Sequence, residues 1–265
     1  MADVTPAMAF VTTKHLMLAL VASPLFIYAV FATRAVIFTT LEKLRPARPH
    51  SYWPTLPNDL ASVMAYSWII FPLAIYLTRY VPGRHQYPFS LAALPWPVRV
   101  ALYFAVADFG YYWVHRLMHT RCVWRIHMWH HSPRYLYWLA GMRASLPQEY
   151  IVNIPYILAA PLIGPTEWWV FVVIATHVGF KNDWQHMNVE WRSSWLEWLL
   201  VTPRYHHIHH SADPRHYVAN LGDLLTIWDR LFGTYVDPLA VPSSFELGLG
   251  EGVEPRRAPR MLLGV

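Results

Sequence analysis

Apolar stretches recur along the first two thirds of this 265-residue chain. Three of them approach the roughly 17–25 residues that a bilayer-spanning helix needs; they are Leu16–Phe31, Leu60–Leu77 and Val98–Val114. Two shorter stretches, Tyr150–Ile163 and Pro165–Phe180, are predicted to form a hairpin that dips into the membrane. Because only 14% of the residues are charged, against about 25% in soluble domains, a series of buried soluble helices is disfavoured. The chain is therefore predicted to be an all-α integral membrane protein with about four transmembrane or membrane-embedded helices.

The order of the three long stretches also predicts a topology. If each crosses the bilayer in turn, the loop 34–59, the segment 115–149 and everything after residue 180 lie on one face. That face carries most of the lysines and arginines, so the positive-inside rule makes it cytoplasmic. The first stretch is expected to remain as an anchor, because no small-x-small cleavage site precedes Arg34. The prediction is a multi-pass membrane protein with a cytoplasmic, helical, histidine-rich region.

Charge and chain organisation narrow the classes of partner and fold. The net charge is +5, but the basic residues are scattered singly, which favours a membrane surface over nucleic acid. Cys122 is the one cysteine, so no intramolecular disulfide can form. The absence of repeats and long linkers predicts a single membrane domain over 1–265: N-terminal transmembrane helices in 1–100, the chemistry in 101–236 and a C-terminal tail in 237–265. This tail and roughly the first 13 residues are expected to be poorly ordered.

Histidines form three clusters within the region 101–236. The chain contains 15 histidines, and eight of them fall at helical spacings. The clusters are His115-Arg-Leu-Met-His119, His127-Met-Trp-His130-His131 and His206-His207-Ile-His209-His210. Residues three and four apart share a helix face, so each cluster presents imidazoles side by side, with His207 off the face of its neighbours. Thr202 and Pro203 predict a helix start just before the third cluster.

The spacing of these clusters predicts metal binding. A structural zinc takes four ligands and a catalytic zinc usually three, so eight clustered histidines suit two metal ions with open positions. Imidazole binds iron, zinc, copper and nickel, so the ligand type alone leaves the metal open. Neutral imidazoles do not offset the charge of a metal, and Asp108 is a candidate carboxylate beside the site. The alternative is that the histidines are ordinary surface residues. That interpretation fits the isolated histidines better, namely His15, His50, His85 and His216.

Three further residues follow or end the last apolar stretch. His186 is expected to be an additional metal ligand, because it lies just beyond that stretch within Asn182-Asp-Trp-Gln-His186. Asn182 is four residues earlier, on the same face if the segment is helical, and stays an open candidate. His177 lies in the stretch itself and either binds metal or forms a hydrogen bond within the helix bundle.

Four stretches of the chain resemble the fatty acid hydroxylase superfamily, in particular its sterol desaturase-like branch. They are Asp108-Phe-Gly-Tyr-Tyr-Trp-Val-His115-Arg-Leu-Met-His119, Trp124-Arg-Ile-His127-Met-Trp-His130-His131-Ser132, Thr202-Pro-Arg-Tyr-His206-His-Ile-His209-His210-Ser211 and Asn220-Leu-Gly-Asp-Leu-Leu-Thr-Ile-Trp228-Asp229-Arg-Leu-Phe232-Gly233-Thr234-Tyr235. The resemblance covers about half of the chain, from Leu102 to Tyr235. Related sequences often continue after the second cluster with Arg-x-His and then a glutamate, whereas this chain has Arg143-Ala-Ser145, followed by Glu149.

The resemblance implies a membrane enzyme with a histidine-ligated di-iron centre. Such enzymes use O2 and two electrons to hydroxylate or desaturate C–H bonds of lipids, such as a sterol or a fatty acyl chain. The implied ligands of the two iron ions are His115, His119, His127, His130, His131, His186, His206, His209 and His210. No His-Pro-Gly-Gly haem-binding segment is present, so the implied electron donor is a separate protein of the ferredoxin or cytochrome b5 type.

Two other classes of function remain as alternatives. A membrane zinc hydrolase would need a general-base glutamate, as in HExxH, but Arg116 stands at that position in the first cluster. A non-enzymatic metal-binding or transport protein would place ionisable groups at the middle of the bilayer, whereas these histidines lie at and beyond the ends of apolar stretches. Haem would need only one or two axial histidines and would leave most of the clusters unexplained.

Overall fold

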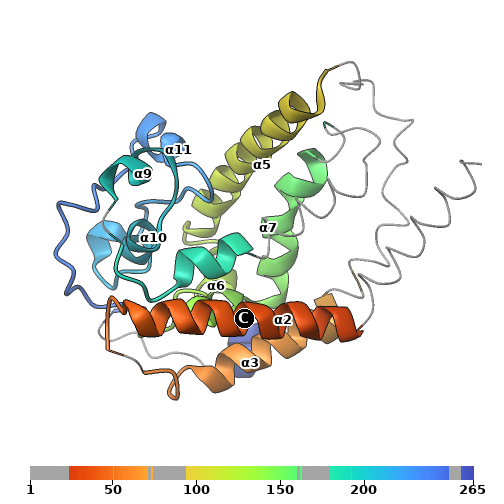
Figure 1. Ribbon diagram of the computed structural model, residues 1–265, viewed down its shortest axis with the longest axis vertical. Coiled ribbons are helices and arrows are strands. Elements are labelled where there is room, and N and C mark those ends of the chain that lie inside the picture. The colour runs from red at the N-terminus through yellow and green to blue at the C-terminus, as the bar shows by residue number, and fades with distance from the viewer. Residues whose placement is uncertain are drawn as a thin grey trace, which may run out of the picture.

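All the regular secondary structure in the described residues is helical, with irregular loops between the helices. The computed structural model describes residues 24–49, 51–70, 73, 94–159, 162, 180–191, 193–250 and 258–265 (Figure 1). Its helices are α2 (Pro24–Leu44), α3 (Leu56–Ala65), η1 (Tyr66–Ile70), α5 (Trp96–Met118), α6 (Trp124–His127), η5 (Trp138–Met142), α7 (Leu146–Ala159), α9 (Ser194–Leu199), α10 (Pro203–His209), η7 (Pro214–His216), α11 (Ile227–Leu231) and α12 (Ala258–Leu263). Strand-like pairing within these ranges is limited to three isolated bridges. The all-helical prediction is confirmed for this part of the chain.

The membrane helices are a separate question. None of the helices in the described ranges is both long enough and apolar enough to be a candidate membrane span. Pro165–Phe180 lies outside the described residues except for its last position, as do parts of Leu16–Phe31, Leu60–Leu77 and Tyr150–Ile163. The predicted transmembrane helices and the predicted topology therefore stay predictions.

Helices α5 and α7 form a closely packed pair that carries the first histidine cluster (Figure 1). Proline flanks the start of α5, where its fixed φ and missing N–H fit the first helical turn. Gly110 of α5 faces Pro155 of α7 so closely that a Cβ at residue 110 would lie 2.9 Å from the proline Cβ. The small residue therefore lets the two helices approach, and the approach sets where the C-terminal end of α5 lies.

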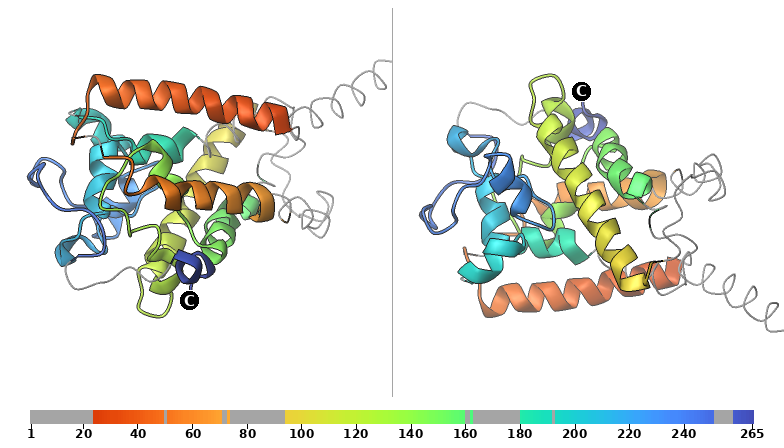
Figure 2. Two further views of the ribbon diagram at one scale, coloured as in Figure 1. Left: turned by 90° about the horizontal axis from the view of Figure 1, so that it is seen from below. Right: turned by 90° about the horizontal axis from the view of Figure 1, so that it is seen from above.

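Helix α2 continues past the point where its apolar stretch ends. Arg34 lies in the middle of α2 and forms a bidentate ion pair with the buried Asp183. Its Nε and Nη2 atoms each lie 2.6 Å from a carboxylate oxygen of Asp183. This pair joins α2 to the short helix at 180–186, which also carries His186. Figure 2 shows α2 along one side of the molecule and α12 along the opposite side.

The C-terminal region is packed against the rest of the molecule. The prediction of a poorly ordered tail is wrong for 237–250 and 258–265, since Leu247, Leu249 and Met261 are buried. Leu249 and Met261 pack with Trp129 in one apolar cluster, and α12 contacts α6 and α7. These apolar residues are too widely spaced to produce a periodic pattern, which is why the sequence did not reveal the packing. The first 13 residues lie outside the described ranges.

Glu42 is a fully buried carboxylate that joins three parts of the chain. Its Oε1 accepts hydrogen bonds from the backbone amides of Trp138 and Asn188, both at 2.8 Å, and its Oε2 accepts one from the Tyr52 hydroxyl. Burial raises the pKa of Glu42 to about 7, although these hydrogen bonds act in the opposite direction. The carboxyl group therefore holds the last turn of α2 against the segments that flank the histidine clusters.

Replacing Glu42 by Gln should remove part of the pH dependence of stability. A raised pKa means that the folded state binds the proton more tightly, so the Glu42 contribution to the free energy of unfolding falls by about 3 kcal/mol as pH rises from 4.5 through 7. Glu42→Gln keeps an acceptor for both amides and carries no charge. Melting temperatures in detergent at pH 5 and pH 8 should therefore differ less in the variant than in the wild type; equal differences would contradict the assignment.

Candidate metal centre

Nine histidines gather into two adjacent groups. The five-histidine group consists of His115, His119, His127, His131 and His209, and the four-histidine group consists of His130, His186, His206 and His210. Within each group, one ring nitrogen from every residue lies within 4.8 Å of those from the others. All nine residues that the sequence singled out as metal ligands are in these groups, and all but His119 are buried.

Four elements bring these side chains together. His115 and His119 end α5, while the second cluster lies on α6 and the turn that follows it. His186 ends the short helix at 180–186, and the third cluster lies on α10 (Figure 1). The predicted start of α10 is confirmed, because the Thr202 hydroxyl accepts a hydrogen bond from the Tyr205 amide and proline occupies the first turn.

The four-histidine group has the geometry of a metal site. The Nε2 atom of His186 lies 3.3 Å from that of His130, 3.2 Å from that of His210 and 3.0 Å from that of His206. A tetrahedral metal with bonds of about 2.0 Å to nitrogen would separate its ligand atoms by about 3.3 Å. Four imidazole nitrogens so close together are best explained by a cation that their lone pairs share.

The five-histidine group is looser but also converges on one point. The Nε2 atom of His127 lies 3.1 Å from those of both His115 and His131. The Nε2 atoms of His119 and His209 are buried and have no hydrogen-bond partner, which is costly unless something else binds them. The groups touch, since the rings of His131 and His210 stack at 4.3 Å.

Consecutive histidines divide between the two groups. His130 belongs to the four-histidine group and His131 to the other, while His210 and His209 divide in the same way. The helical face argument correctly brought each cluster together, but it did not predict this division. A pair of neighbouring metal positions, each held from several elements, is the arrangement that fits both groups.

Hydrogen bonds at Nδ1 fix the orientation of five of the rings. A carbonyl oxygen can only accept, so each of these rings must be protonated at Nδ1 and carry its lone pair at Nε2. The acceptors are Leu221 O for His115, Ala219 O for His209, Arg143 O for His130, Asn182 O for His186 and Gln148 Oε1 for His127, at 2.8–3.0 Å. This pattern directs the Nε2 lone pairs of these five rings toward the centre of each group.

The loop after residue 218 supplies two of these acceptors. Asn220 has a φ of 54°, a left-handed conformation that asparagine tolerates better than most residues. It separates the Ala219 carbonyl, which binds His209, from the Leu221 carbonyl, which binds His115. The Asn220 side chain bonds the backbone of Tyr205 and of residue 236, so the strained residue is held on both sides.

Two buried carboxylates hold the same loop. Asp229 accepts hydrogen bonds from the backbone amides of Leu221 and Gly222, both at 2.7 Å. Asp108 accepts from the backbone amides of Leu224 and Leu225. The sequence suggested that Asp108 lies beside a metal site, whereas its carboxylate hydrogen-bonds to this loop and to the Trp228 ring. Asp108 therefore acts on the histidines through the backbone that it anchors.

A buried ion pair supports His130 from the opposite side. Arg143 donates from Nε to Asp59 Oδ1 at 2.6 Å, and its Nη2 donates to the Thr55 carbonyl. The Arg143 carbonyl is the acceptor for His130. Asp59 comes from α3, so a residue of the N-terminal region orients a ligand of the four-histidine group. No feature of the isolated sequence around Asp59 indicated this role.

Ser145 occupies the position where related sequences often have a histidine. Its hydroxyl donates to the Ile126 carbonyl at 2.6 Å and accepts from the Gln148 amide. Gln148 in turn accepts the hydrogen bond from His127. The serine thus ties the start of α7 to α6 and supports a ligand indirectly.

The remaining candidates that the structure describes lie outside both groups. The His207 ring bonds the His186 carbonyl at 3.3 Å, as expected for a residue off the shared face. Asn182 offers its backbone carbonyl to His186, while its side chain amide points to the Met142 sulfur. His216 is buried elsewhere. The positions 15, 50, 85 and 177 lie outside the described residues.

Burial keeps the clustered imidazoles neutral. It lowers the pKa of His115 to about 4 and that of His130 to about 3, and it lowers the pKa of the other seven well below the usual range. A neutral imidazole is the form that binds a metal, so the ligand atoms are available at neutral pH without the loss of a proton.

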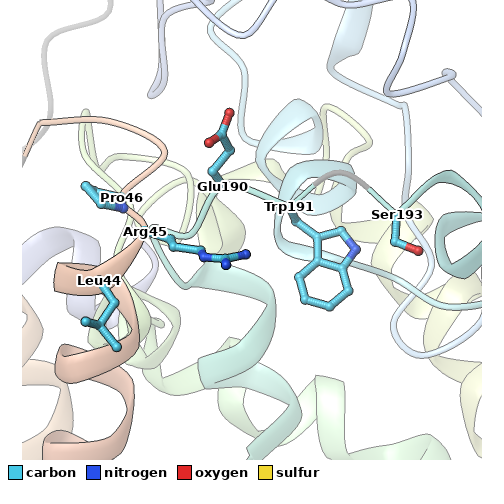
Figure 3. A pocket seen from close by; sticks show the side chains of 6 residues that line it. All are labelled: Leu44, Arg45, Pro46, Glu190, Trp191 and Ser193. Carbon is cyan, nitrogen blue, oxygen red and sulfur yellow. The ribbon is translucent and has the colours of Figure 1, made fainter.

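Two pockets lie near the surface of the described part. One, of about 130 Å³, opens onto the five-histidine group and is lined by three of its histidines together with Trp124, Tyr217 and Leu249. The other, of about 510 Å³, lies where α2 ends and is lined by the residues that Figure 3 labels, Leu44, Arg45, Pro46, Glu190, Trp191 and Ser193. The second pocket contains no histidine and no part of either group.

Comparison with known proteins identifies the family. The fatty acid hydroxylase model matches residues 100–234, about half of the chain and the whole span of the histidine clusters. The chain belongs to the fatty acid hydroxylase family. It matches no solved structure.

Several curated relatives are lipid oxygenases by name. The chain is 36% identical over 154 residues to alkylglycerol monooxygenase of Xenopus tropicalis, covering 56% of this chain and 33% of the relative. It is 33% identical over 186 residues to alkylglycerol monooxygenase of Homo sapiens, covering 68% and 40%. It is 36% identical over 162 residues to ornithine lipid hydroxylase OlsE of Rhizobium tropici, covering 58% and 47%. The chain thus spans about a third to a half of these relatives.

Replacing Asp59 by Asn should disturb the four-histidine group selectively. Removing one member of a buried ion pair costs about 3–5 kcal/mol, because the other charge is left unpaired. Arg143 would then shift, and its carbonyl would no longer orient His130. Metal titration of the purified variant should show weaker binding for one of two metal ions. Equal weakening of both would show that Asp59 acts on the fold rather than on His130.

Replacing His206 and His207 one at a time should show which of the two rings binds metal. His206→Ala removes an Nε2 atom from the four-histidine group, so the bound metal per chain should fall. His207→Ala removes a weak hydrogen bond at 3.3 Å and leaves all nine clustered histidines in place. A metal content that falls more in His207→Ala than in His206→Ala would overturn the assignment of the two rings.

Proposed function

We propose that this protein is an O2-dependent, di-iron oxidoreductase that hydroxylates or desaturates C–H bonds of a lipid. The observation that carries the proposal is the pair of adjacent, buried, all-histidine groups within a chain of the fatty acid hydroxylase family. The five-histidine group would hold one iron ion and the four-histidine group the other. The nine ligands would be His115, His119, His127, His130, His131, His186, His206, His209 and His210.

The residues of the chain hold and shield the centre rather than react. When bound, the two iron ions would activate O2, which gives one oxygen atom to a hydroxylated product and the other to water, with two electrons and two protons consumed. The backbone acceptors at residues 219 and 221 keep two rings in one tautomer, and the buried ion pair of Arg143 with Asp59 keeps a third in place. Such outer hydrogen bonds typically change metal affinity or activity by about 10–100-fold.

A lipid substrate is supported by the relatives and by the surface of α5. The names of the relatives refer to alkylglycerols, ornithine lipids and fatty acids, which all carry a long alkyl chain. Along α5 an exposed apolar stripe leads toward the histidines. It consists of Val98, Leu102, Val106, Phe109, Trp113 and Leu117, each 37–52% exposed. Such a stripe fits contact with acyl chains, and we infer an integral membrane location with the histidines on the cytoplasmic side.

The electrons would come from a separate protein. The family resemblance implies an external donor of the ferredoxin or cytochrome b5 type. A zinc hydrolase is disfavoured, because Arg116 stands where HExxH has its general-base glutamate and, within the described residues, both groups consist of histidines alone.

Metal analysis of single variants tests the proposal. Protein purified in detergent from iron-supplemented cells should contain about two iron ions per chain, and His130→Ala and His209→Ala should each lose iron and abolish lipid oxidation. His216→Ala is a matched control, since that buried histidine lies outside both groups. Products would be sought from alkylglycerol, ornithine lipid and fatty acid substrates with O2 and a reductase. Full iron content and activity in both cluster variants would falsify the ligand assignment.

A further inference from the structure

A row of aromatic rings connects the protein surface to the five-histidine group. The ring of Trp124 lies 5.2 Å from that of His119 and 5.3 Å from that of His131, measured between centroids. On its other side Trp124 stacks on Tyr217, with the planes 22° apart and the centroids separated by 6.5 Å. Tyr217 is 39% exposed. The four rings therefore run without interruption from solvent to two of the proposed ligands.

Hydrogen bonds to the backbone fix the rings at both ends of this row. The His119 ring hydrogen-bonds the Tyr217 carbonyl, and the Tyr217 hydroxyl donates to the Leu249 carbonyl at 3.4 Å. Trp124 also packs on the apolar cluster of Leu249 and Met261, which comes from the C-terminal region. The tryptophan is thus fixed in position although it starts a helix of only four residues.

The surface around Tyr217 and Trp124 is basic. Five exposed arginines lie on the segments that surround the two rings and form what we call the arginine rim: Arg121, Arg125, Arg134, Arg215 and Arg260. Arg125 follows Trp124 directly, and Arg260 lies on α12, which contacts α6. Acidic residues on the same described segments are fewer, namely Asp213, which pairs with Arg215, and Glu246.

The rim is also placed where a water-soluble partner can reach it. It lies at the C-terminal end of α5, whereas Trp96 begins that helix, and 23 helical residues span about 34 Å. The rim and Trp96 therefore lie toward opposite ends of α5. Helix α12, which carries Arg260, lies on the opposite side of the molecule from α2 (Figure 2).

We propose that the arginine rim docks a small acidic protein that carries one electron at a time, and that the electron enters through Tyr217 and Trp124. The inference rests on the proposed function. In each encounter the reduced donor loses one electron and the metal centre gains one, so two donors in succession supply the two electrons of a turnover. Basic and acidic surfaces that face each other accelerate association by roughly 10–10³-fold.

Binding of a probe protein tests the docking surface without any bound iron. The probe is an oxidised plant-type [2Fe–2S] ferredoxin, titrated against the metal-free protein in detergent. Arg125→Glu should slow association by about tenfold, the lower end of the range for charge steering, and added salt should weaken binding. Lys43→Glu is the matched control, because it makes the same charge change at an exposed position on α2. Equal losses in the two variants, or no binding by the wild type, would overturn the proposal.

The single cysteine allows the aromatic path to be tested directly. Cys122 is exposed and lies two residues before Trp124, so a ruthenium photoreductant attached to its sulfur delivers electrons at the rim. After a flash, reduction of iron in the loaded protein should be slower in Trp124→Leu than in the wild type. Trp124→Phe keeps a ring in place and should retain the wild-type rate. Equal rates in Trp124→Leu and the wild type would exclude the path.

The two experiments also separate this inference from the proposed function. Ferredoxin that binds at the rim of a chain that takes up no iron would support docking and contradict the di-iron enzyme. Iron that binds normally and is reduced equally fast in all Trp124 variants would contradict the path and leave the enzyme intact.

Discussion

The convergence of nine neutral imidazoles is the constraint on which the rest of this structure depends. Lone pairs about 3 Å apart repel one another, and burial removes the water that would otherwise satisfy them. The arrangement holds only if each ring is fixed from behind and if something positive fills the centre. The structure meets the first requirement with backbone carbonyls, which can only accept and therefore leave one protonation pattern at the rings they bind.

Buried carboxylates in turn fix the backbone that carries these acceptors. Asp229 and Asp108 hold the loop that follows Asn220, and Glu42 holds the segments around residues 138 and 188. Each takes two backbone amides, so removing one carboxylate strands two buried N–H groups. The polar groups far from the histidines thus determine ring positions as much as the helices do.

The histidines that converge could be predicted from the sequence, but the residues that position them could not. The helical spacing of His115 with His119, or of His206 with His210, is local information, and so is the cap at Thr202. Asp59 and Arg143 are 84 positions apart, and nothing near either residue indicates the other. The sequence placed Asp108 beside the metal because it lies two turns before His115, yet its side chain turns to a distant loop. Long-range pairing of this kind depends on the packed fold and leaves no periodic pattern.

The charges around the centre bear on the partners that we propose for it. Three carboxylates near the histidine-bearing elements are each neutralised by a base: Asp59 by Arg143, Asp223 by Lys181 and Asp183 by Arg34. Both histidine groups consist of neutral imidazoles without a carboxylate, so the groups themselves would leave the charge of two bound metal ions uncompensated. The net charge around a metal centre is among the factors that set its reduction potential, and a more positive centre accepts electrons more readily. The same excess of positive charge would attract anionic ligands and the acidic donor that we propose. The all-histidine composition of both groups and the arginine rim would therefore act in one direction.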